Sequence, residues 1–253
     1  MTHSILIIGQ SNMAGRGYPM PYEFLDNCAG KLLVARNGRW QVMFRPVNPD
    51  RAFSGSCLAE SFAKAYYLDH PDVSVGVIPC ADGGTSLSQW EEGSLLFDYA
   101  VSCAKLAMRT SRLVAILWHQ GEGDCSEACA AAYFDKITAM VNALRREIGA
   151  EDVPFIVGGL GDYLVKYPAP NLGEWYGAVN AQLMRYAESD ARVGYASAEG
   201  LTPNPDNLHF NHASLMEFGL RYYAEFRKLE KTEAGDAQAP IEEDTKRSAM
   251  EML

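Results

Sequence analysis

Ser11 is the first residue of the chain whose type and place fit a nucleophile. It lies in Gly-Gln-Ser-Asn-Met (residues 9–13), directly after the apolar run 5–8. In an open parallel sheet, ligands bind beyond the carboxyl ends of the strands. A serine on such a turn exposes its hydroxyl beside backbone N–H groups, which suits a nucleophile and its oxyanion. Serine is also a preferred helix N-cap, so the pentapeptide alone favours the cap.

Asp206 and His209 are the two side chains that a serine nucleophile would need as partners. Serine hydrolysis requires an imidazole that takes the hydroxyl proton and a carboxylate that orients the imidazole. The two residues are three positions apart, after the Pro-rich segment 202–205, and the order Ser, Asp, His occurs in several hydrolases. In a second interpretation Asp206 is a turn residue and His209 or His212 starts a helix. In a third, His209 and His212 bind zinc, but no Cys or acidic cluster has a matching ligand spacing.

A pair of glycines, Gly83 and Gly84, follows the apolar run 73–78. Glycines at the carboxyl end of a strand let backbone N–H groups approach a ligand closely. The segment 81–86 lacks the Gly-Lys-Ser/Thr sequence of a phosphate-binding loop. Taken alone, the pair indicates a simple turn between a strand and a helix.

Residues 118–124 (Trp-His-Gln-Gly-Glu-Gly-Asp) place an amide, an imidazole and two carboxylates at the end of another apolar run. The amide of Gln120 is a suitable donor to an oxyanion. Glu122 and Asp124 also fit the start of the next helix, where carboxylates are favourable. All four clusters follow expected strands or the last loop, at the face where a parallel sheet binds ligands, and together they predict one site.

Short apolar runs alternate with longer helical patterns along the chain. The runs suit strands buried on both faces, and they cover residues 5–8, 32–35, 73–78, 113–118, 155–157 and 193–196. Apolar residues at spacings of three and four predict helices over residues 56–69, 95–109 and 127–148 and around 176–186 and 215–226. The alternation predicts an α/β fold, a parallel sheet with helices on both sides. Residues 16–54 break the pattern and are expected to form long loops with room for one hairpin.

The composition excludes several classes of protein. Hydrophobic residues make up 48% of the 253 residues, which is enough to bury a full core. The formal charge of −10, from 22 basic and 32 acidic residues, argues against a nucleic-acid partner, because phosphates attract clustered Lys and Arg. No apolar run is long enough to span a membrane, so no membrane partner is expected.

The C-terminal segment 230–253 differs from the rest of the chain. It holds seven acidic and three basic residues, a net −4, and almost no large apolar side chain. Such a segment is expected to be a disordered tail. A single domain, residues 1–229, then carries the remaining −6.

The cysteines and the N-terminus indicate a cytoplasmic protein. The six cysteines lie mostly among apolar neighbours, which predicts buried thiols rather than a disulfide framework. The N-terminus has neither the positive start nor the long apolar stretch of a signal peptide. A secreted chain already freed of its signal peptide would look the same.

Taken together, the motifs resemble the SGNH hydrolase superfamily, and within it the sialate O-acetylesterase-like domain and carbohydrate esterase family six, which includes acetylxylan esterases. Four matching segments stand in the family's order and span residues 5 to about 226. They are residues 9–15, Gly83-Gly84-Thr85-Ser86-Leu87 with Trp90, His119-Gln120-Gly121-Glu122, and Asp206 with His209. The chain departs from the family at Gly123, where Ser or Ala is frequent.

The resemblance implies a three-layer, flavodoxin-like α/β/α fold with a five-stranded parallel sheet. It implies Ser11 as nucleophile, His209 as general base and Asp206 as the partner of His209. The oxyanion hole would consist of the backbone N–H of Ser11, that of Gly83 or Gly84, and the side chain of Gln120. Residues with a supporting or substrate-binding role would be Asn12, Thr85, Trp90, His119 and Glu122. No metal ion and no cofactor is expected.

The implied activity is removal of O-acetyl groups from acetylated carbohydrates, of the sialic acid or xylo-oligosaccharide type, through an acetyl-serine intermediate. The expected partner is a small-molecule or oligosaccharide acetyl ester, and the oligomeric state stays open. A lipase or thioesterase with the same triad is one alternative. A carbohydrate-binding relative without turnover is the other.

Overall fold

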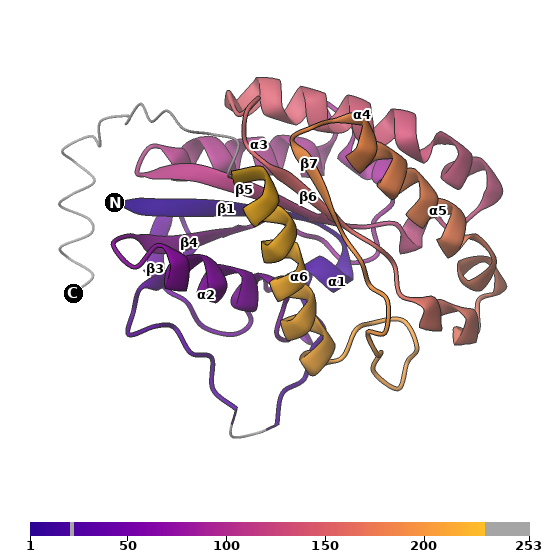
Figure 1. Cartoon of the computed structure of the whole chain (residues 1–253), viewed down its shortest axis with the longest axis horizontal. Coiled ribbons are helices and arrows are strands. Elements are labelled where there is room, and N and C mark those ends of the chain that lie inside the picture. The colour runs from indigo at the N-terminus through magenta and orange to yellow at the C-terminus, as the bar shows by residue number, and fades with distance from the viewer. Residues whose placement is uncertain (21–22, 231–253) are drawn as a thin grey trace.

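The protein is built around one seven-stranded sheet, as the computed structural model shows for residues 1–20 and 23–230 (Figure 1). The strand order is β3-β2-β4-β1-β5-β6-β7. The strands are β1 (Thr2–Gly9), β2 (Leu32–Arg36), β3 (Arg39–Val42), β4 (Ser74–Pro79), β5 (Ser111–His119), β6 (Phe155–Gly158) and β7 (Val193–Ala196). All neighbours pair in parallel except β2 and β3.

Each of the six predicted apolar runs forms a strand of this sheet. The central strand β1 is fully buried from Ser4 to Gly9, and burial of each aliphatic side chain there contributes roughly 1.5–3 kcal/mol. The five-stranded parallel sheet implied by the resemblance is wrong, because the sheet is mixed and has seven strands. Two strands extend the edge beyond β4. There β2 pairs with β4 in parallel, and β3 folds back on β2.

The antiparallel strand β3 follows from a two-residue turn. Asn37 and Gly38 both have positive φ, 52° and 75°, and this is the conformation that a tight hairpin between twisted strands needs. The turn places Arg36 opposite Arg39 and Leu33 opposite Val42. One hairpin was expected within residues 16–54, and this is its position.

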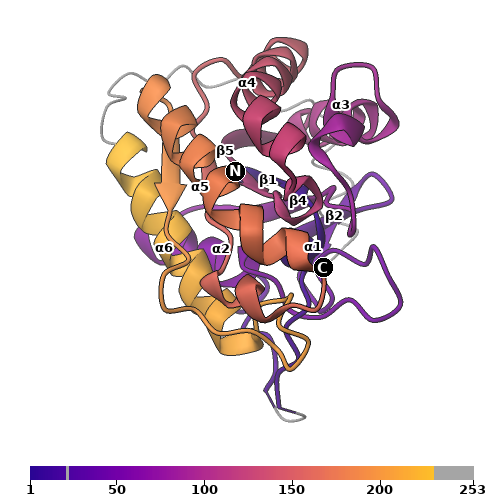
Figure 2. The same ribbon diagram turned by 90° about the vertical axis from the view of Figure 1, so that its right-hand side faces the viewer.

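Helices cover both faces of the sheet, as Figures 1 and 2 show. The helices α3 (Leu95–Met108), α4 (Glu127–Ile148) and α5 (Pro170–Ser189) pack on one face. On the other face lie α2 (Ala59–Asp69) and α6 (His212–Glu230). Short helical turns follow four of the strands: α1 (Ser11–Ala14) follows β1, and the 3-10 turns Leu87–Trp90, Glu122–Asp124 and Asp162–Lys166 follow β4, β5 and β6.

The predicted C-terminal tail, 230–253, lies outside the described residues except for Glu230, which ends α6. No disulfide joins the six cysteines: Cys57, Cys80 and Cys125 are buried, Cys28 and Cys103 are partly exposed, and Cys129 is exposed. Within residues 1–20 and 23–230, none of the helices has both the length and the apolar character needed to cross a membrane.

The turn after β1 depends on close approach of two backbones. Gly9 has φ +128°, and a Cβ added there would collide with the carbonyl oxygen of His119. The same carbonyl accepts a hydrogen bond of 2.9 Å from the N–H of Gln10. The chain therefore leaves β1 and turns into α1 directly against the end of β5.

We predict that Gly9→Ala destabilises the protein more than Gly93→Ala does. Both glycines have positive φ, but a Cβ at Gly93 would meet no atom within 4 Å. Gly93→Ala should lower the free energy of unfolding by about 1–2 kcal/mol, and Gly9→Ala by at least ~3 kcal/mol because of the added overlap with the backbone. Chemical denaturation measures both values. Equal losses would contradict the proposed close approach.

Candidate active site

Ser11, His209 and Asp206 form a continuous hydrogen-bonded chain. Nε2 of His209 lies 3.0 Å from Oγ of Ser11, and Nδ1 lies 2.7 Å from Oδ2 of Asp206. Ser11 is the first residue of α1, just beyond the carboxyl end of β1. The other two residues lie on the loop before α6. This is the arrangement in which an imidazole accepts a proton from a serine hydroxyl while a carboxylate fixes its tautomer.

The carboxylate of Asp206 is held by the same turn that carries His209. Its Oδ1 accepts hydrogen bonds from the backbone N–H groups of Leu208, at 2.9 Å, and His209, at 3.0 Å. Partial burial raises the pKa of Asp206, but these N–H groups and the His209 ring lower it by more, so the net shift is downward. A carboxylate with this lowered pKa is ionised at neutral pH and can stabilise an imidazolium.

The Asn12 side chain ties the turn of Ser11 to the loop of His209. Its amide nitrogen donates to the carbonyl of Leu208, at 3.3 Å, and to Oε1 of Glu122, at 2.5 Å. Its amide oxygen accepts from the N–H of Phe210, at 3.0 Å. Asn12 is buried, so it supports the site and does not face a substrate.

Glu122 and His119 continue this buried support. Oε1 of Glu122 lies 3.5 Å from Nε2 of His119, and both side chains are buried. Burial raises the pKa of Glu122, but His119 and Asn12 together lower it by more. The other ring nitrogen of His119 lies 3.3 Å from the hydroxyl of Tyr222. The structure therefore places His119 and Glu122 beneath the site rather than in it.

The predicted oxyanion donors differ in their availability. Within the part of the chain that the structure describes, no protein group accepts a hydrogen bond from the N–H of Ser11 or of Gly84. The N–H of Gly83 already donates to Oδ2 of Asp50, at 2.9 Å. A Cβ added to Gly83 would lie 3.4 Å from Cβ of Ser11, so this turn lies directly against the nucleophile. The structure leaves Ser11 and Gly84 as the available backbone donors.

The amide of Gln120 is fully engaged inside the protein. Its nitrogen has three acceptors, namely Oδ2 of Asp124 at 2.6 Å, the Thr85 carbonyl at 3.1 Å and Oε1 of Gln10 at 3.2 Å. Its oxygen accepts from the hydroxyl of Tyr133 at 2.9 Å. The amide nitrogen has only two hydrogens, so none is left for a further acceptor such as an oxyanion. The oxyanion role of Gln120 stays a prediction, and in this structure the side chain joins neighbouring loops.

Thr85 and Trp90 are also buried. The indole N–H of Trp90 donates to Oγ1 of Thr85, at 3.1 Å, and this hydroxyl donates to the carbonyl of Asp82, at 2.8 Å. These two hydrogen bonds stabilise the turn after β4 from its buried side. At Gly123, a Cβ would lie 2.7 Å from the Thr85 carbonyl, so the departure from Ser or Ala permits a close contact between two loops.

Arg16 and Asp50, which the sequence did not indicate as site residues, form a buried ion pair beside Gly83. Nη2 of Arg16 lies 2.7 Å from Oδ2 of Asp50, and each side chain is only 3% exposed. Asp50 lies in the segment 16–54, which was expected to form long loops with room for one hairpin. Its type, a lone acid in a loop, carried no signal. Arg16 follows the motif 9–15 directly, and this position was the available hint.

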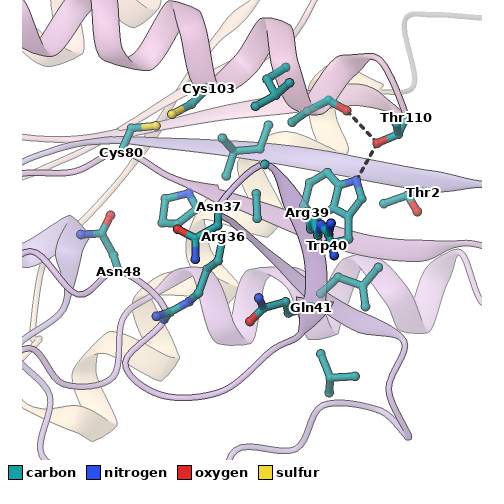
Figure 3. Close-up of a pocket in the computed structure, with 18 of the residues that line it drawn as sticks. Thr2, Arg36, Asn37, Arg39, Trp40, Gln41, Asn48, Cys80, Cys103 and Thr110 are labelled. Atoms are coloured by element: carbon teal, nitrogen blue, oxygen red, sulfur yellow. Dashed lines mark hydrogen bonds between the residues drawn. The ribbon is translucent and has the colours of Figure 1, made fainter. Parts of the chain in front are cut away.

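A cavity of about 1220 Å³ lies beside the β2–β3 edge and α3 and extends to Asn48, Asp50 and Asp82 (Figure 3). Its lining includes Trp40 and Cys103 but none of Ser11, Asp206 and His209. The indole N–H of Trp40 donates to Thr110 at its rim, at 2.9 Å. The cavity therefore does not mark the reactive site.

The alternative zinc pair is not assembled. His209 contacts Ser11 and Asp206, whereas His212 lies 2.6 Å from Oγ of Ser56 and 2.6 Å from a carboxylate oxygen of Glu23. In residues 1–20 and 23–230, no group of three or more His, Cys, Asp or Glu side chains is suited to a metal ion.

The sequence is similar to those of known carbohydrate esterases. A family model described as carbohydrate esterase, sialic acid-specific acetylesterase, matches residues 1–228. A probable carbohydrate esterase of Arabidopsis thaliana is 26% identical over an alignment of 239 positions, which covers 85% of this chain and 86% of that protein.

Three solved structures are similar in fold. The X-ray structure of the same Arabidopsis thaliana protein superposes with a TM-score of 0.78 at 23% identity, covering 89% of this chain and 98% of the other. The structure of NanS gives 0.72 at 16% identity, over 92% of this chain and 98% of that one. A carbohydrate acetylesterase from Xanthomonas citri gives 0.65 at 17% identity, over 91% of this chain and 57% of that one.

We predict that Asn12→Ala slows the reaction of Ser11 with an organophosphonate at least about tenfold, since displacement of reacting groups by about 1 Å costs on the order of 10²-fold. The substitution removes both hydrogen bonds from Asn12 to the His209 loop, those with Leu208 and Phe210. Mass spectrometry of the labelled protein over time measures the rate.

Asn180→Ala is the matched control for this experiment. The side-chain amide of Asn180 accepts a hydrogen bond from the N–H of Leu160, at 2.7 Å, and donates one to the carbonyl of Leu160, at 3.0 Å. Its loss should lower stability without slowing the labelling of Ser11. Equal labelling rates in the two variants would contradict the role given to Asn12.

Proposed function

The chain belongs to the carbohydrate esterase family of sialic acid-specific acetylesterases and is a carboxylic ester hydrolase, and from this premise we propose that it releases acetate from O-acetylated carbohydrates through an acetyl-Ser11 intermediate. Family and fold indicate carbohydrate acetylesterase activity. The observation that carries the proposed mechanism is the contact of 3.0 Å between Nε2 of His209 and Oγ of Ser11.

In the acylation step, Oγ of Ser11 attacks the carbonyl carbon of the acetyl ester while Nε2 of His209 takes its proton. The tetrahedral intermediate carries its negative charge on the former carbonyl oxygen. Collapse of this intermediate breaks the bond to the sugar oxygen, which leaves with the proton returned by His209. The products of this step are the free sugar hydroxyl and acetyl-Ser11.

In the deacylation step, a water molecule takes the place of the sugar. His209 accepts a proton from the water as its oxygen attacks the acetyl carbon, and then returns the proton to Oγ of Ser11. Acetate leaves and the triad is restored. Asp206 remains ionised throughout and stabilises the imidazolium in both steps, and its lowered pKa supports this role.

The oxyanion is stabilised by the backbone N–H groups of Ser11 and Gly84. Neither of these N–H groups donates to another described residue, so both are available to the oxyanion. Gly83 and Gln120 support the same turn through their existing hydrogen bonds. One well-placed donor to an oxyanion is worth about 10²–10³-fold in rate.

Two exposed aromatic rings close to the site support a carbohydrate substrate. Tyr18 and Phe53 are 56% and 60% exposed, and the Tyr18 hydroxyl donates to the Phe53 carbonyl, at 3.1 Å. The ring of Phe53 lies 5.2 Å from the guanidinium carbon of Arg16, beside the Gly83 turn. The faces of such rings are suited to the apolar face of a sugar. The two rings support the proposal of an acetylated sugar, of the sialic acid or xylo-oligosaccharide type, as the substrate.

We predict that Ser11→Ala lowers acetate release from 4-nitrophenyl acetate and from acetylated sugars by at least about 10³-fold, as loss of a serine nucleophile does in other hydrolases. An acetate-release assay over acetylated xylan fragments, O-acetyl sialic acids and simple acyl esters measures the change. Ser102→Ala, at an exposed position of α3, is the control and should have wild-type activity.

Three results would contradict the proposal in different ways. Wild-type activity of Ser11→Ala would exclude Ser11 as the nucleophile. Faster turnover of long acyl chains would indicate a lipase or thioesterase. Binding of sugar without labelling of Ser11 would indicate a carbohydrate-binding protein.

We further predict that Phe53→Ala raises KM for an acetylated sugar about threefold to tenfold, because one aromatic contact contributes roughly 0.5–1.5 kcal/mol. Its kinetics with 4-nitrophenyl acetate should stay as in the wild type, because this ester has no sugar ring. Tyr99→Ala, an exposed aromatic residue on α3, is the matched control. An equal change with both substrates would contradict a sugar-binding role.

A further inference from the structure

We propose that Arg16 and Asp50 act as a positioning pair that holds the turn of Gly83 and Gly84 against Ser11, with the N–H of Gly84 directed to the oxyanion. This inference rests on the proposed function. It assigns a role in the reaction to a segment, residues 16–54, that the family motifs do not cover.

The carboxylate of Asp50 uses both of its oxygens. Oδ1 accepts from Nη1 of Arg16, at 3.0 Å, and from Oγ of Ser54, at 2.7 Å. Oδ2 accepts from Nη2 of Arg16, at 2.7 Å, and from the N–H of Gly83, at 2.9 Å. Burial raises the pKa of Asp50, but the hydrogen bonds from Arg16 and Ser54 lower it by more. The carboxylate is therefore ionised, and both of its oxygens accept hydrogen bonds. Only one of these bonds, from the N–H of Gly83, comes from the turn of Gly83 and Gly84.

Arg16 connects this carboxylate to the other parts of the site. Its Nη1 also donates to the carbonyl of Gly15, at 2.9 Å, at the end of the nucleophile turn. Its own carbonyl accepts from Nδ2 of Asn204, at 2.8 Å. The N–H of Asn204 in turn donates to the carbonyl of His209, at 2.7 Å. One buried residue thus contacts the nucleophile turn, the oxyanion turn through Asp50, and the histidine loop through Asn204.

The peptide groups of Gly83 are fixed on both sides. Its N–H is held by Asp50, and its carbonyl accepts from Nη2 of Arg51, at 2.8 Å. A Cβ at Gly83 would lie 2.6 Å from Nη2 of Arg16 and 2.8 Å from Oδ2 of Asp50, so the ion pair fits only against a glycine. With Gly83 held this way, the next N–H, that of Gly84, is the free donor of the turn.

The segment that carries Asp50 is itself anchored to the same turn. The side-chain amide of Asn48 accepts from the N–H of Ala81 and donates to its carbonyl, each at 2.9 Å. Arg51 also contacts the carboxylate of Asp82, at 2.6 Å. On its other side, the segment continues to Gly55, whose N–H donates to the Gly15 carbonyl, at 3.0 Å. Asp50 is therefore held by contacts of its neighbours with the residues before Gly83 and with Gly15 of the nucleophile turn, besides its own bond to the N–H of Gly83.

The charge of Asp50 explains why its partner in this pair is an arginine. A lone carboxylate beside a developing oxyanion would raise the energy of the transition state. The guanidinium of Arg16 neutralises Asp50, and its planar fork binds both carboxylate oxygens at once, which a lysine cannot do.

The test compares Asp50→Asn and Arg16→Lys with the wild type on 4-nitrophenyl acetate. Each variant should lower kcat at least about tenfold, because the oxyanion donor of the turn is displaced, while KM changes by less than about threefold. The rate of Ser11 phosphonylation should fall with kcat, since the phosphonate also places an oxygen in the oxyanion hole.

Asp190→Asn is the matched control. Asp190 pairs with buried Arg145, Nη1 to Oδ2 at 2.7 Å, next to the start of β7 and so at the opposite end of the strands from Ser11. Asp190→Asn should lower the melting temperature and leave kcat, KM and the rate of phosphonylation unchanged.

Ser54→Ala removes a single hydrogen bond from Asp50 and should lower kcat about threefold. This variant decides the question if Asp50→Asn does not fold.

The possible outcomes separate the two proposals. Absence of Ser11-dependent acetate release by the wild type would overturn the proposed function, and the positioning role with it. An active wild type with kcat within about twofold in folded Asp50→Asn and Arg16→Lys, or with an equal loss in Asp190→Asn, would overturn the positioning role alone. In the case where Asp50→Asn does not fold, unchanged kcat in Ser54→Ala would overturn it.

Discussion

The buried amide of Asn12 is the contact on which the rest of the site depends. Ser11 and His209 are 198 residues apart in the chain, and Asn12, next to the nucleophile, bonds to both neighbours of His209. Glu122, in the 3-10 turn after β5, holds the amide in place. If the His209 loop moved away from the Ser11 turn, the Asn12 amide and its partners would be left buried without hydrogen bonds, which costs free energy. The folded protein therefore keeps the two segments together.

Much of the fold could be predicted from the pattern of apolar residues. The predicted runs and helices match the observed ones, and 127–148 and 193–196 match to the residue, because a run buried on both faces has a strong signal. The edge strand β3 was not placed, since it has only four residues and only one of them, Trp40, is buried. Its available signal was Asn37-Gly38, a typical hairpin turn.

The site was predicted less evenly. The residues of the triad were found because their chemistry needs particular side chains in a particular order. Gln120 was expected to face the oxyanion, but its side chain also donates to Thr85 and Gln10, which are 35 and 110 residues away, and local sequence does not show such contacts. Asp50 has no local signal either, because its partners, Arg16 and Gly83, are 34 and 33 residues away. Residues that position a site are recognised only when the fold brings them together.

The central claim is that Ser11 carries the acetyl group during turnover. The most direct measurement mixes the wild-type protein with saturating 4-nitrophenyl acetate, stops the reaction with acid within the first turnover, and determines the mass of the peptide that contains Ser11. The account predicts an acetyl group on Ser11 that forms with the initial burst of 4-nitrophenol and disappears as the substrate is used up. A burst without acetylation of this peptide, or with the acetyl group on another residue, would contradict it.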